Sequence, residues 1–205
     1  MFGDLLPIKP ALEPISIQDA EVYYLRELLL AQSAEAVMRQ LIDQVPWRAE
    51  NIFMWRKSVP QPRLVAWFGD REAHYTYSGV RHDPLPWTPV LLDIRKRVEG
   101  IASTHFNSVL LNYYRNHRDS MGLHSDDEPE LGPQPVIASL SLGGERIFIM
   151  KHKTRRELKS VRLRLASGSL LLMKGETQHY WKHGIDKQAQ PCGPRVNLTF
   201  RRICR

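Results

Sequence analysis

The spacing of hydrophobic residues changes near residue 105, and this change divides the chain into a helical part and a strand-rich part. Residues 33–45 and 87–102 carry apolar side chains three and four positions apart, which is the period of an amphipathic helix. Ser33 stands at the start of the first segment, and Thr88 followed by Pro89 starts the second. Because these residue types are typical of helix N-termini, two helices are expected here.

Three other segments before residue 105 are less regular. Residues 1–14 contain three prolines and show no periodicity, which predicts an irregular arm. Residues 16–28 begin with Ser16 three positions before Asp19, an arrangement like a capping box, and predict a short helix, alone or leading from a strand. The aromatic-rich stretch over residues 51–79 predicts a long hairpin or a strand pair.

From residue 106 onward, apolar and polar residues alternate in short segments separated by Gly, Pro and polar turns. A period of two is typical of strands with one buried face. Strands that follow helices in this way favour an α+β fold, in which a β-sandwich or jelly roll packs against helices. The chain length suits a single domain over residues 15–205. The expected strands lie within residues 106–114, 136–143, 146–153, 161–166, 168–174 and 195–203.

The chain has a formal net charge of +7, which favours a polyanionic partner such as nucleic acid. A basic enzyme without such a partner is the alternative that charge alone leaves open. The two cysteines do not make a disulfide framework and are interpreted as reduced thiols. The N-terminus has no signal-peptide pattern, and the apolar runs are too short to cross a bilayer. We therefore expect an intracellular monomer without a membrane partner, cytoplasmic in a bacterium or nuclear in a eukaryote.

The motif "GLHSDDE" at residues 122–128 places His124 two positions before Asp126. In an extended chain these two side chains point to the same side, where both can reach one metal ion. Two histidines and one carboxylate form the facial triad that binds non-haem Fe(II). His179 and His183, which follow an apolar strand, are both candidates for the third ligand, and the alternative is that one or both only cover the edge of the core. A solvated acidic turn is the alternative that this spacing leaves open.

The last expected strand, "PRVNLTFRR", separates apolar and polar residues onto opposite faces. The polar face carries two arginines, an amide and a hydroxyl but no acid, which is unusual for the simplest alternative, a solvated face. Arginine offers a planar fork that binds carboxylates at two points. We infer a site for a small dicarboxylate, to which the strand at 106–114 would add polar groups; an ordinary strand with its polar residues outward is the alternative for that strand. The polar residues on the two strands are Arg195, Asn197, Thr199 and Arg201, and Asn112 and Tyr114.

Together these segments resemble the AlkB family of Fe(II)- and 2-oxoglutarate-dependent nucleic-acid dealkylases, and the pattern looks closest to the branch that repairs duplex DNA. The resemblance covers at least residues 50–204 and implies a double-stranded β-helix, or jelly roll, over residues 106–205. It also implies a nucleotide-recognition lid over residues 50–82. The motifs that carry the resemblance are "NYY" at 112–114, "HSDDE" at 124–128, the histidine at 183 and "PRVNLTFR" at 194–201.

The resemblance implies that the protein uses Fe(II), 2-oxoglutarate and O2. His124, Asp126 and His183 would bind Fe(II), and His183 is preferred over His179 because its distance to the last strand matches the family. The implied reaction hydroxylates the N-methyl group of a base such as 1-methyladenine or 3-methylcytosine in DNA. The methyl carbon leaves as formaldehyde, while 2-oxoglutarate yields succinate and CO2. The residues implied to hold 2-oxoglutarate are Asn112, Tyr114, Arg195, Asn197, Thr199 and Arg201.

A methyl group on the pairing edge of a base lies inside a duplex, so the base must be flipped out to react. By resemblance, Phe53 would fill the gap that the flipped base leaves, although packing into the core is an alternative. The implied contacts to the base come from Tyr75, Tyr77, Ser78, Asp127 and Glu128; simple solvation is the alternative for the two acids. Contacts to phosphates are expected from Arg56, Lys57, Arg63, Lys151, Lys153 and Arg155.

One departure from the duplex-acting branch is the loop "DKQAQPCG" after His183, which is only weakly basic. The sequence therefore leaves the choice between duplex and single-stranded substrates open. Two alternative functions are the same chemistry on RNA or protein and a noncatalytic nucleic-acid-binding protein. The complete set of expected ligands disfavours the noncatalytic protein, and the aromatic hairpin, which a protein substrate would not need, disfavours a protein substrate.

Overall fold

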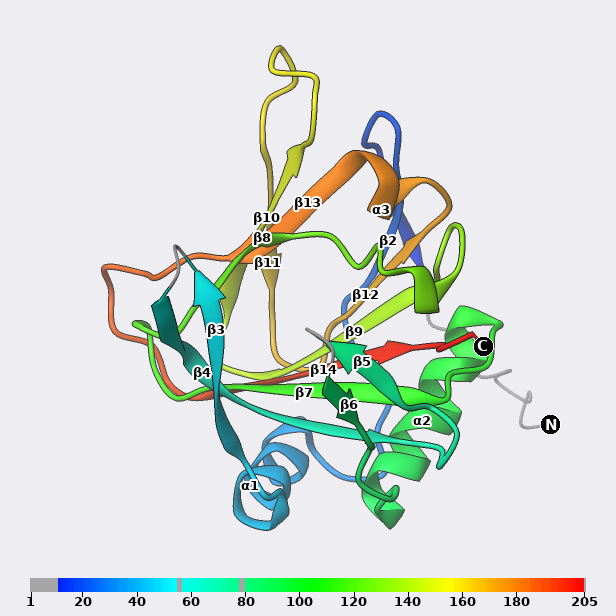
Figure 1. The fold of residues 1–205 in the computed structure, drawn as a ribbon, viewed down its shortest axis with the longest axis vertical. Helices are drawn as coiled ribbons and strands as arrows, with labels where there is room; N and C mark the ends of the chain where they lie inside the picture. Colours follow the sequence, from blue (N-terminus) through cyan, green and yellow to red (C-terminus); the bar gives the residue numbers. More distant parts are fainter. Residues whose placement is uncertain (1–10, 55–56, 78–79, 205) are drawn as a thin grey trace, which may run out of the picture.

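The structure is a computed structural model that describes residues 11–54, 57–77 and 80–204, and Figure 1 shows its fold. Within residues 52–60 and 75–82 the description is confined to the backbone of the strands. Two antiparallel sheets face each other and form a jelly roll, and helices cover one of them. The expected α+β fold with a jelly-roll core is confirmed.

The larger sheet has eight strands in the order β1-β2-β12-β9-β14-β7-β4-β3. Its centre is β14, which pairs along its length with β7 on one side and with β9 on the other. The C-terminal strand of the chain is therefore the most enclosed one. The strands are β1 (Glu13–Ile15), β2 (Glu21–Leu25), β3 (Arg48–Met54), β4 (Lys57–Gly69), β7 (Ser108–Tyr114), β9 (Ile137–Gly143), β12 (Leu170–Lys174) and β14 (Arg195–Arg201).

The smaller sheet has four strands in the order β11-β10-β13-β8. It lies over the inner face of the larger sheet, and the hairpin from β10 to β11 projects beyond it (Figure 1). A separate pair, β5 and β6, follows β4 in the chain. The strands are β8 (Met121–His124), β10 (Arg146–His152), β11 (Val161–Leu165), β13 (Trp181–Ile185), β5 (Tyr75–Tyr77) and β6 (Val80–His82).

The two expected helices are α1 (Ala34–Gln44) and α2 (Pro89–Ala102), and both begin as predicted. The hydroxyl of Ser33 accepts a hydrogen bond from the Ala36 N–H, and Thr88 caps α2 in the same way. The apolar stripes of the helices pack on the outer face of the larger sheet, where every second residue of β14 is apolar. The intervening residues of β14 must therefore point toward the smaller sheet.

The helix expected over residues 16–28 is wrong, because this segment contains strand β2, which pairs with β1 and β12. Val22 packs in the inner core, whereas Tyr23 and Leu25 pack against the outer one. This alternation has the period of a strand, and pairing with a distant strand outweighs the weak capping signal. The arm expected over residues 1–14 is also too long by two residues, because β1 begins at Glu13. Residues 1–10 lie outside the described residues.

The aromatic-rich stretch forms two hairpins rather than one. β3 pairs with β4 at the edge of the larger sheet, and β5 pairs with β6 to form a small ribbon. The expected lid over residues 50–82 coincides with these two hairpins, and its role remains a prediction.

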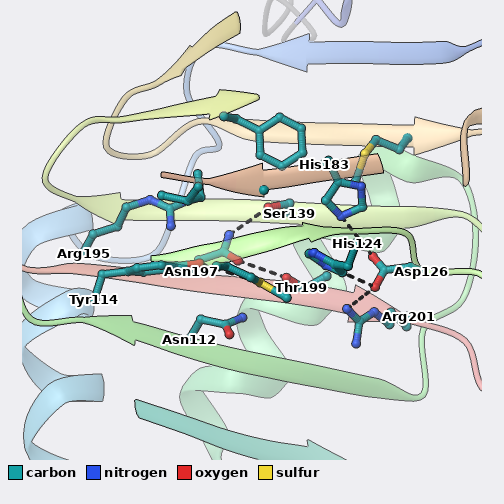
Figure 2. Close-up of a pocket in the computed structure, with 15 residues that line it drawn as sticks. Asn112, Tyr114, His124, Asp126, Ser139, His183, Arg195, Asn197, Thr199 and Arg201 are labelled. Atoms are coloured by element: carbon teal, nitrogen blue, oxygen red, sulfur yellow. Dashed lines mark hydrogen bonds and ion pairs between the residues drawn. The ribbon is translucent and has the colours of Figure 1, made fainter. Parts of the chain in front are cut away.

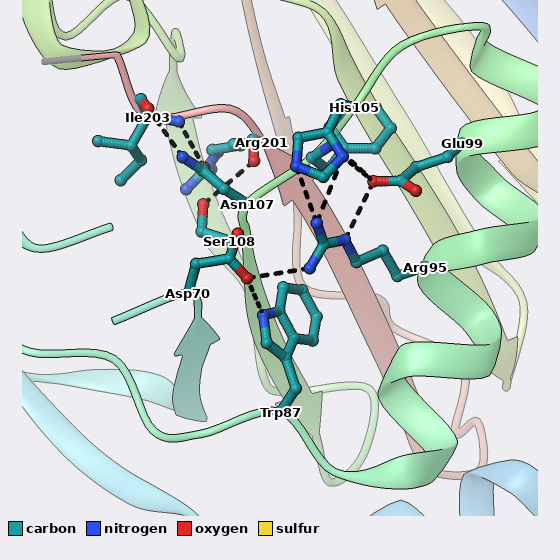
Figure 3. Close-up of polar contacts among 10 residues, drawn as sticks. Asp70, Trp87, Arg95, Glu99, His105, Asn107, Ser108, Arg201 and Ile203 are labelled. Atoms are coloured by element: carbon teal, nitrogen blue, oxygen red, sulfur yellow. Dashed lines mark hydrogen bonds and ion pairs between the residues drawn. The ribbon is translucent and has the colours of Figure 1, made fainter. Parts of the chain in front are cut away.

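A polar network ties α2 to the loop between β4 and β5 (Figure 3). Asp70 accepts hydrogen bonds from Trp87 Nε1 at 2.7 Å and from Arg95 Nη1 at 3.0 Å. The Arg95 guanidinium also donates to Glu99 at 3.0 Å and lies over the Trp87 ring. The network therefore fixes the loop that leads into the β5–β6 hairpin. None of the helices in the described residues is long and apolar enough to cross a membrane.

Candidate active site

A cavity between the two sheets collects most of the polar residues expected to act together (Figure 2). Strands β7, β9, β12 and β14 supply one wall, and β8, β10 and β13 supply the other. Its position explains why the alternate residues of β14 are buried although they are polar. The lining residues are Asn112, Tyr114, Met121, His124, Asp126, Ser139, Phe148, Met173, His183, Gly184, Ile185, Arg195, Asn197, Thr199 and Arg201.

Two histidines and one aspartate meet in this cavity. His124 ends β8 and stands directly opposite His183 on β13, with ring centroids 4.4 Å apart. The Oδ2 atom of Asp126 lies 3.7 Å from His183 Nε2, and its Oδ1 atom lies 4.0 Å from His124 Nε2. One ligand atom from each residue falls within 4.8 Å of the others, a separation that one ion can bridge. The predicted metal triad is thus assembled.

The structure also decides between the two candidate histidines. His179 lies in the short helix α3 (Thr177–Tyr180), where its side chain is exposed and stacks edge-on against Tyr180. His183 is buried and joins the triad. The fold thus brings His183, and not His179, to the other two residues of the predicted triad.

The electrostatics of the triad suit a divalent cation. Burial, together with the neighbouring His124, lowers the pKa of His183 to about 3, so its imidazole is neutral and free to coordinate. Burial alone would raise the pKa of Asp126, but the positive charge of Arg201 and the neighbouring histidines outweigh it and lower the pKa. No hydrogen-bond donor among the described residues reaches Asp126 Oδ2, which is buried. A carboxylate oxygen without a partner beside two imidazoles fits a bound metal ion.

Arg201 stands at the metal end of the cavity. Its Nη2 atom donates to Asp126 Oδ1 at 2.5 Å, whereas its buried Nε has no acceptor among the residues that the structure describes. The guanidinium thus holds the ligand carboxylate and keeps a donor for another anion.

Arg195 stands at the opposite end of the cavity (Figure 2). Its guanidinium lies over the Tyr114 ring, 5.0 Å from the centroid, and Nη2 donates to Ser141 at 3.0 Å. Its buried Nε and Nη1 atoms find no acceptor in the described part of the chain. Burial lowers the pKa of Arg195, but an arginine stays protonated in proteins. Two open donors on a buried cation fit a carboxylate, so the cavity fits a dicarboxylate that also reaches the metal.

The neutral polar residues between the two arginines are held by one another. Asn197 donates to the Ser139 hydroxyl at 2.8 Å and to the Leu140 carbonyl at 2.9 Å. Thr199 donates to the Asn197 side-chain oxygen at 3.0 Å. These bonds fix the floor of the cavity before any ligand enters.

Arg63 was expected to contact phosphate, and its position contradicts that expectation. Only 7% of the residue is exposed, and its Nε donates to Asn112 Oδ1 at 2.6 Å. This hydrogen bond occupies the Asn112 side-chain oxygen, so the Asn112 NH2 group is the part of the amide that remains for a ligand in the cavity. Sequence reasoning missed this role because β4 meets β7 only in the folded sheet. Ser139 and Ser141 were missed for the same reason, since their strand was assigned without regard to its inner face.

Two residues with separate expected roles contact each other. Lys153 Nζ donates to Asp127 Oδ2 at 2.8 Å, and the Asp127 side chain is 55% exposed at the edge of the site. Arg155 pairs with Glu157 and with Asp19, whereas Lys151 is exposed. The phosphate contacts of Lys153 and Arg155 would therefore compete with existing ion pairs.

The remaining predicted contacts cannot be placed in the same way. Glu128 lies between Asp127 and the short 3-10 helix η1 (Pro129–Leu131), partly buried. Arg56 and Ser78 lie outside the described residues, and so do the side chains of Phe53, Lys57, Tyr75 and Tyr77.

Comparisons with known proteins agree with this site. A family model described as "2OG-Fe(II) oxygenase superfamily" matches residues 21–201. Mouse alpha-ketoglutarate-dependent dioxygenase alkB homolog 3 is 43% identical over 84% of this chain and 62% of its own length. The chain belongs to the AlkB family of 2OG-Fe(II) oxygenases. Its cofactor and cosubstrates are accordingly Fe(II), 2-oxoglutarate and O2, for which the residues described above provide the fitting groups.

A second group of relatives resembles this AlkB-family chain to a similar degree. Human DNA oxidative demethylase ALKBH2 is 45% identical over 69% of this chain and 57% of its own length. The chain spans about three fifths of the length of these relatives, and the identities do not assign it to one group. The solved structure of OsALKBH1 shares the fold, with a TM-score of 0.66 at 18% identity, over 88% of this chain and 97% of that one.

Proposed function

We propose that this AlkB-family protein oxidatively demethylates N-alkylated bases, such as 1-methyladenine and 3-methylcytosine, in DNA. The observation that carries the proposal is that one cavity joins the His124, Asp126 and His183 triad to two arginines whose donors lack acceptors among the described residues. The similarity to alkB homolog 3 supports the dioxygenase chemistry, and the similarity to the DNA oxidative demethylase ALKBH2 supports DNA as the substrate.

Different residues of the cavity would bind the metal and 2-oxoglutarate. The triad would hold Fe(II) on one face and leave its other positions to ligands. Arg195 would bind the far carboxylate of 2-oxoglutarate, while Arg201 and Asn112 face the metal-proximal part. When bound, Fe(II), O2 and 2-oxoglutarate supply the oxidation that inserts one oxygen atom into the N-methyl C–H bond and the other into succinate, with release of CO2. The hydroxymethyl group then leaves the ring nitrogen as formaldehyde.

The two sheets form the walls of the cavity, so the substrate base would enter at its open edge. Base flipping brings the methyl group to the metal at a cost that is lower for lesions that already prevent pairing. Lid residues Tyr75, Tyr77 and Ser78, together with Asp127 and Glu128, are proposed to contact the flipped base. The net charge of +7 supports an association with the phosphate backbone.

The reaction itself is the first test. Purified protein with Fe(II), 2-oxoglutarate and ascorbate is expected to restore 1-methyladenine or 3-methylcytosine in oligonucleotides and to release one formaldehyde per base. Asp126→Ala is expected to abolish turnover because it removes a metal ligand. If no methylated oligonucleotide yields formaldehyde, the proposal is wrong; if Asp126→Ala stays active, the triad is misassigned.

The preferred strandedness is a separate proposal. We propose that the protein acts on duplex as well as single-stranded DNA, with Phe53 filling the gap left by the flipped base. A comparison of methylated single-stranded DNA, duplex DNA and RNA measures the preference. Phe53→Ala is expected to slow duplex repair more than single-strand repair, and equal losses would indicate a core role for Phe53. RNA as the best substrate would favour the same chemistry in RNA demethylation. We also propose an intracellular monomer, which light scattering and cell fractionation test.

A further inference from the structure

One metal ligand lies outside the sheets. β8 ends at His124, and η1 begins at Pro129, so Asp126 belongs to a connecting segment. His124 and His183 are held in register by the ladder between β8 and β13, but this ladder does not extend to Asp126. A metal ligand must be held to a fraction of an ångström, so other contacts have to fix the Asp126 backbone.

Those contacts come from the segment around α3. The Asp126 N–H donates to Gln178 Oε1 at 2.9 Å, and the preceding Ser125 hydroxyl donates to the Trp181 carbonyl at 3.0 Å. Lys153 Nζ donates both to the Gln178 carbonyl and to Asp127 Oδ2, each at 2.8 Å. Ser125 and Asp126 are therefore attached directly to the segment around α3, and Asp127 is attached to it through Lys153.

Gln178 is the central residue of this arrangement. It is 1% exposed, and its amide nitrogen lies 3.5 Å from the sulfur of Met173, which lines the cavity. A buried carboxamide is costly unless its polar atoms are bonded, and Met173 is a weak acceptor. The favourable contact that explains a glutamine here is the one to the Asp126 N–H, which would otherwise be a buried donor without a partner.

We propose that Gln178 is a positioning residue for the metal centre, which acts through the backbone of Asp126. By accepting the Asp126 N–H, Gln178 sets the direction in which the carboxylate leaves the chain, and Lys153 fixes Gln178 from the outer side. This inference rests on the iron site of the proposed function but not on its nucleic-acid substrate.

Two substitutions of Gln178 test the role. Gln178→Met has a similar length and volume but no strong acceptor, and Gln178→Asn keeps the amide while its oxygen falls one methylene short. The matched control is His179→Met, an exposed position in the same helical turn. Ni(II) affinity of the metal-free proteins is measured by calorimetry at a temperature where all of them are folded, and thermal unfolding is recorded without metal.

Both Gln178 variants are expected to bind Ni(II) about 10- to 100-fold more weakly than the unaltered protein, as for other groups that orient metal ligands. The visible spectrum of their Co(II) forms is expected to change, because a displaced carboxylate alters the coordination geometry. The control should match the unaltered protein in both measurements. Gln178→Asn keeps the test decisive if Gln178→Met does not fold.

Two other outcomes are distinguishable. Unchanged Ni(II) affinity and an unchanged Co(II) spectrum in a less stable Gln178 variant would overturn the inference and leave a purely structural role. Failure of the unaltered protein to bind Ni(II) would instead count against the iron site and the proposed function.

Discussion

Arg201 lines the cavity and donates to Asp126 through Nη2, while its buried Nε meets no acceptor in the part of the chain that the structure describes. Burial opposes a charge on each of these residues, and their pairing offsets that cost. Under the proposed function, Arg201 would link metal binding to 2-oxoglutarate binding through one guanidinium, and Arg195 would bind the ligand at the other end of the cavity.

Replacement of Arg201 should destabilise the metal-free protein more than the metal-bound one. Arg201→Met leaves the Asp126 carboxylate buried without its cation, which is expected to lower the free energy of unfolding by about 3 to 5 kcal/mol. A divalent ion can replace the missing positive charge, so saturating Ni(II) should restore part of the loss. Urea unfolding with and without Ni(II) measures both values. Equal losses in the two conditions would show that Arg201 does not act through Asp126.

Replacement of Arg195 should separate 2-oxoglutarate binding from metal binding. Arg195→Met removes two open charge-assisted donors, each worth about 1.5 to 3 kcal/mol, so the KM for 2-oxoglutarate should rise by at least about 100-fold. The Ni(II) affinity should stay the same because Arg195 does not contact the triad. Arg202→Met, at the exposed position after β14, is the control. A parallel fall in Ni(II) affinity would contradict this division of roles.

Arg63 offers a test between a cavity role and a phosphate contact. Arg63→Met leaves the Asn112 oxygen without its donor, and the KM for 2-oxoglutarate is expected to rise about tenfold. The salt dependence of DNA binding should not change. Lys151→Met, at an exposed position, should by contrast reduce the salt slope by about one. A reduced salt slope of DNA binding in Arg63→Met would show that Arg63 contacts phosphate after all.

The metal-free protein should lose stability as the pH falls. The pKa of His183 is about 3 in the fold against 6.5 in the unfolded chain, so between these values the unfolded chain binds the extra proton. The free energy of unfolding should decrease by up to about 1.4 kcal/mol per pH unit below pH 6.5. The lowered pKa of Asp126 adds a loss in the same direction at more acidic pH. His183→Leu should flatten the slope measured by urea unfolding above pH 4, and an unchanged slope would contradict the assignment.

Several features of this protein follow from local sequence alone. The two helices that begin after Ser33 and Thr88 are predicted by the spacing of their apolar residues and by their capping residues, which act within one turn. The alternation in β14 likewise separates an apolar face from one with Arg195 and Arg201 before any partner strand is known. The H-x-D motif likewise predicts two ligands on one side of an extended segment, although a contact with the distant Gln178 holds the Asp126 backbone in the fold.

Other features required the tertiary structure, because they depend on which distant strands pair. Only the ladder between β8 and β13 brings His183 opposite His124 and leaves His179 outside. Residues within the segment 16–28, where a helix was expected, form strand β2 because they pair with β12. The contacts of Arg63 with Asn112 and of Gln178 with Asp126 join residues 49 and 52 positions apart. No local period encodes such contacts, since burial between two packed sheets decides which polar groups must find each other.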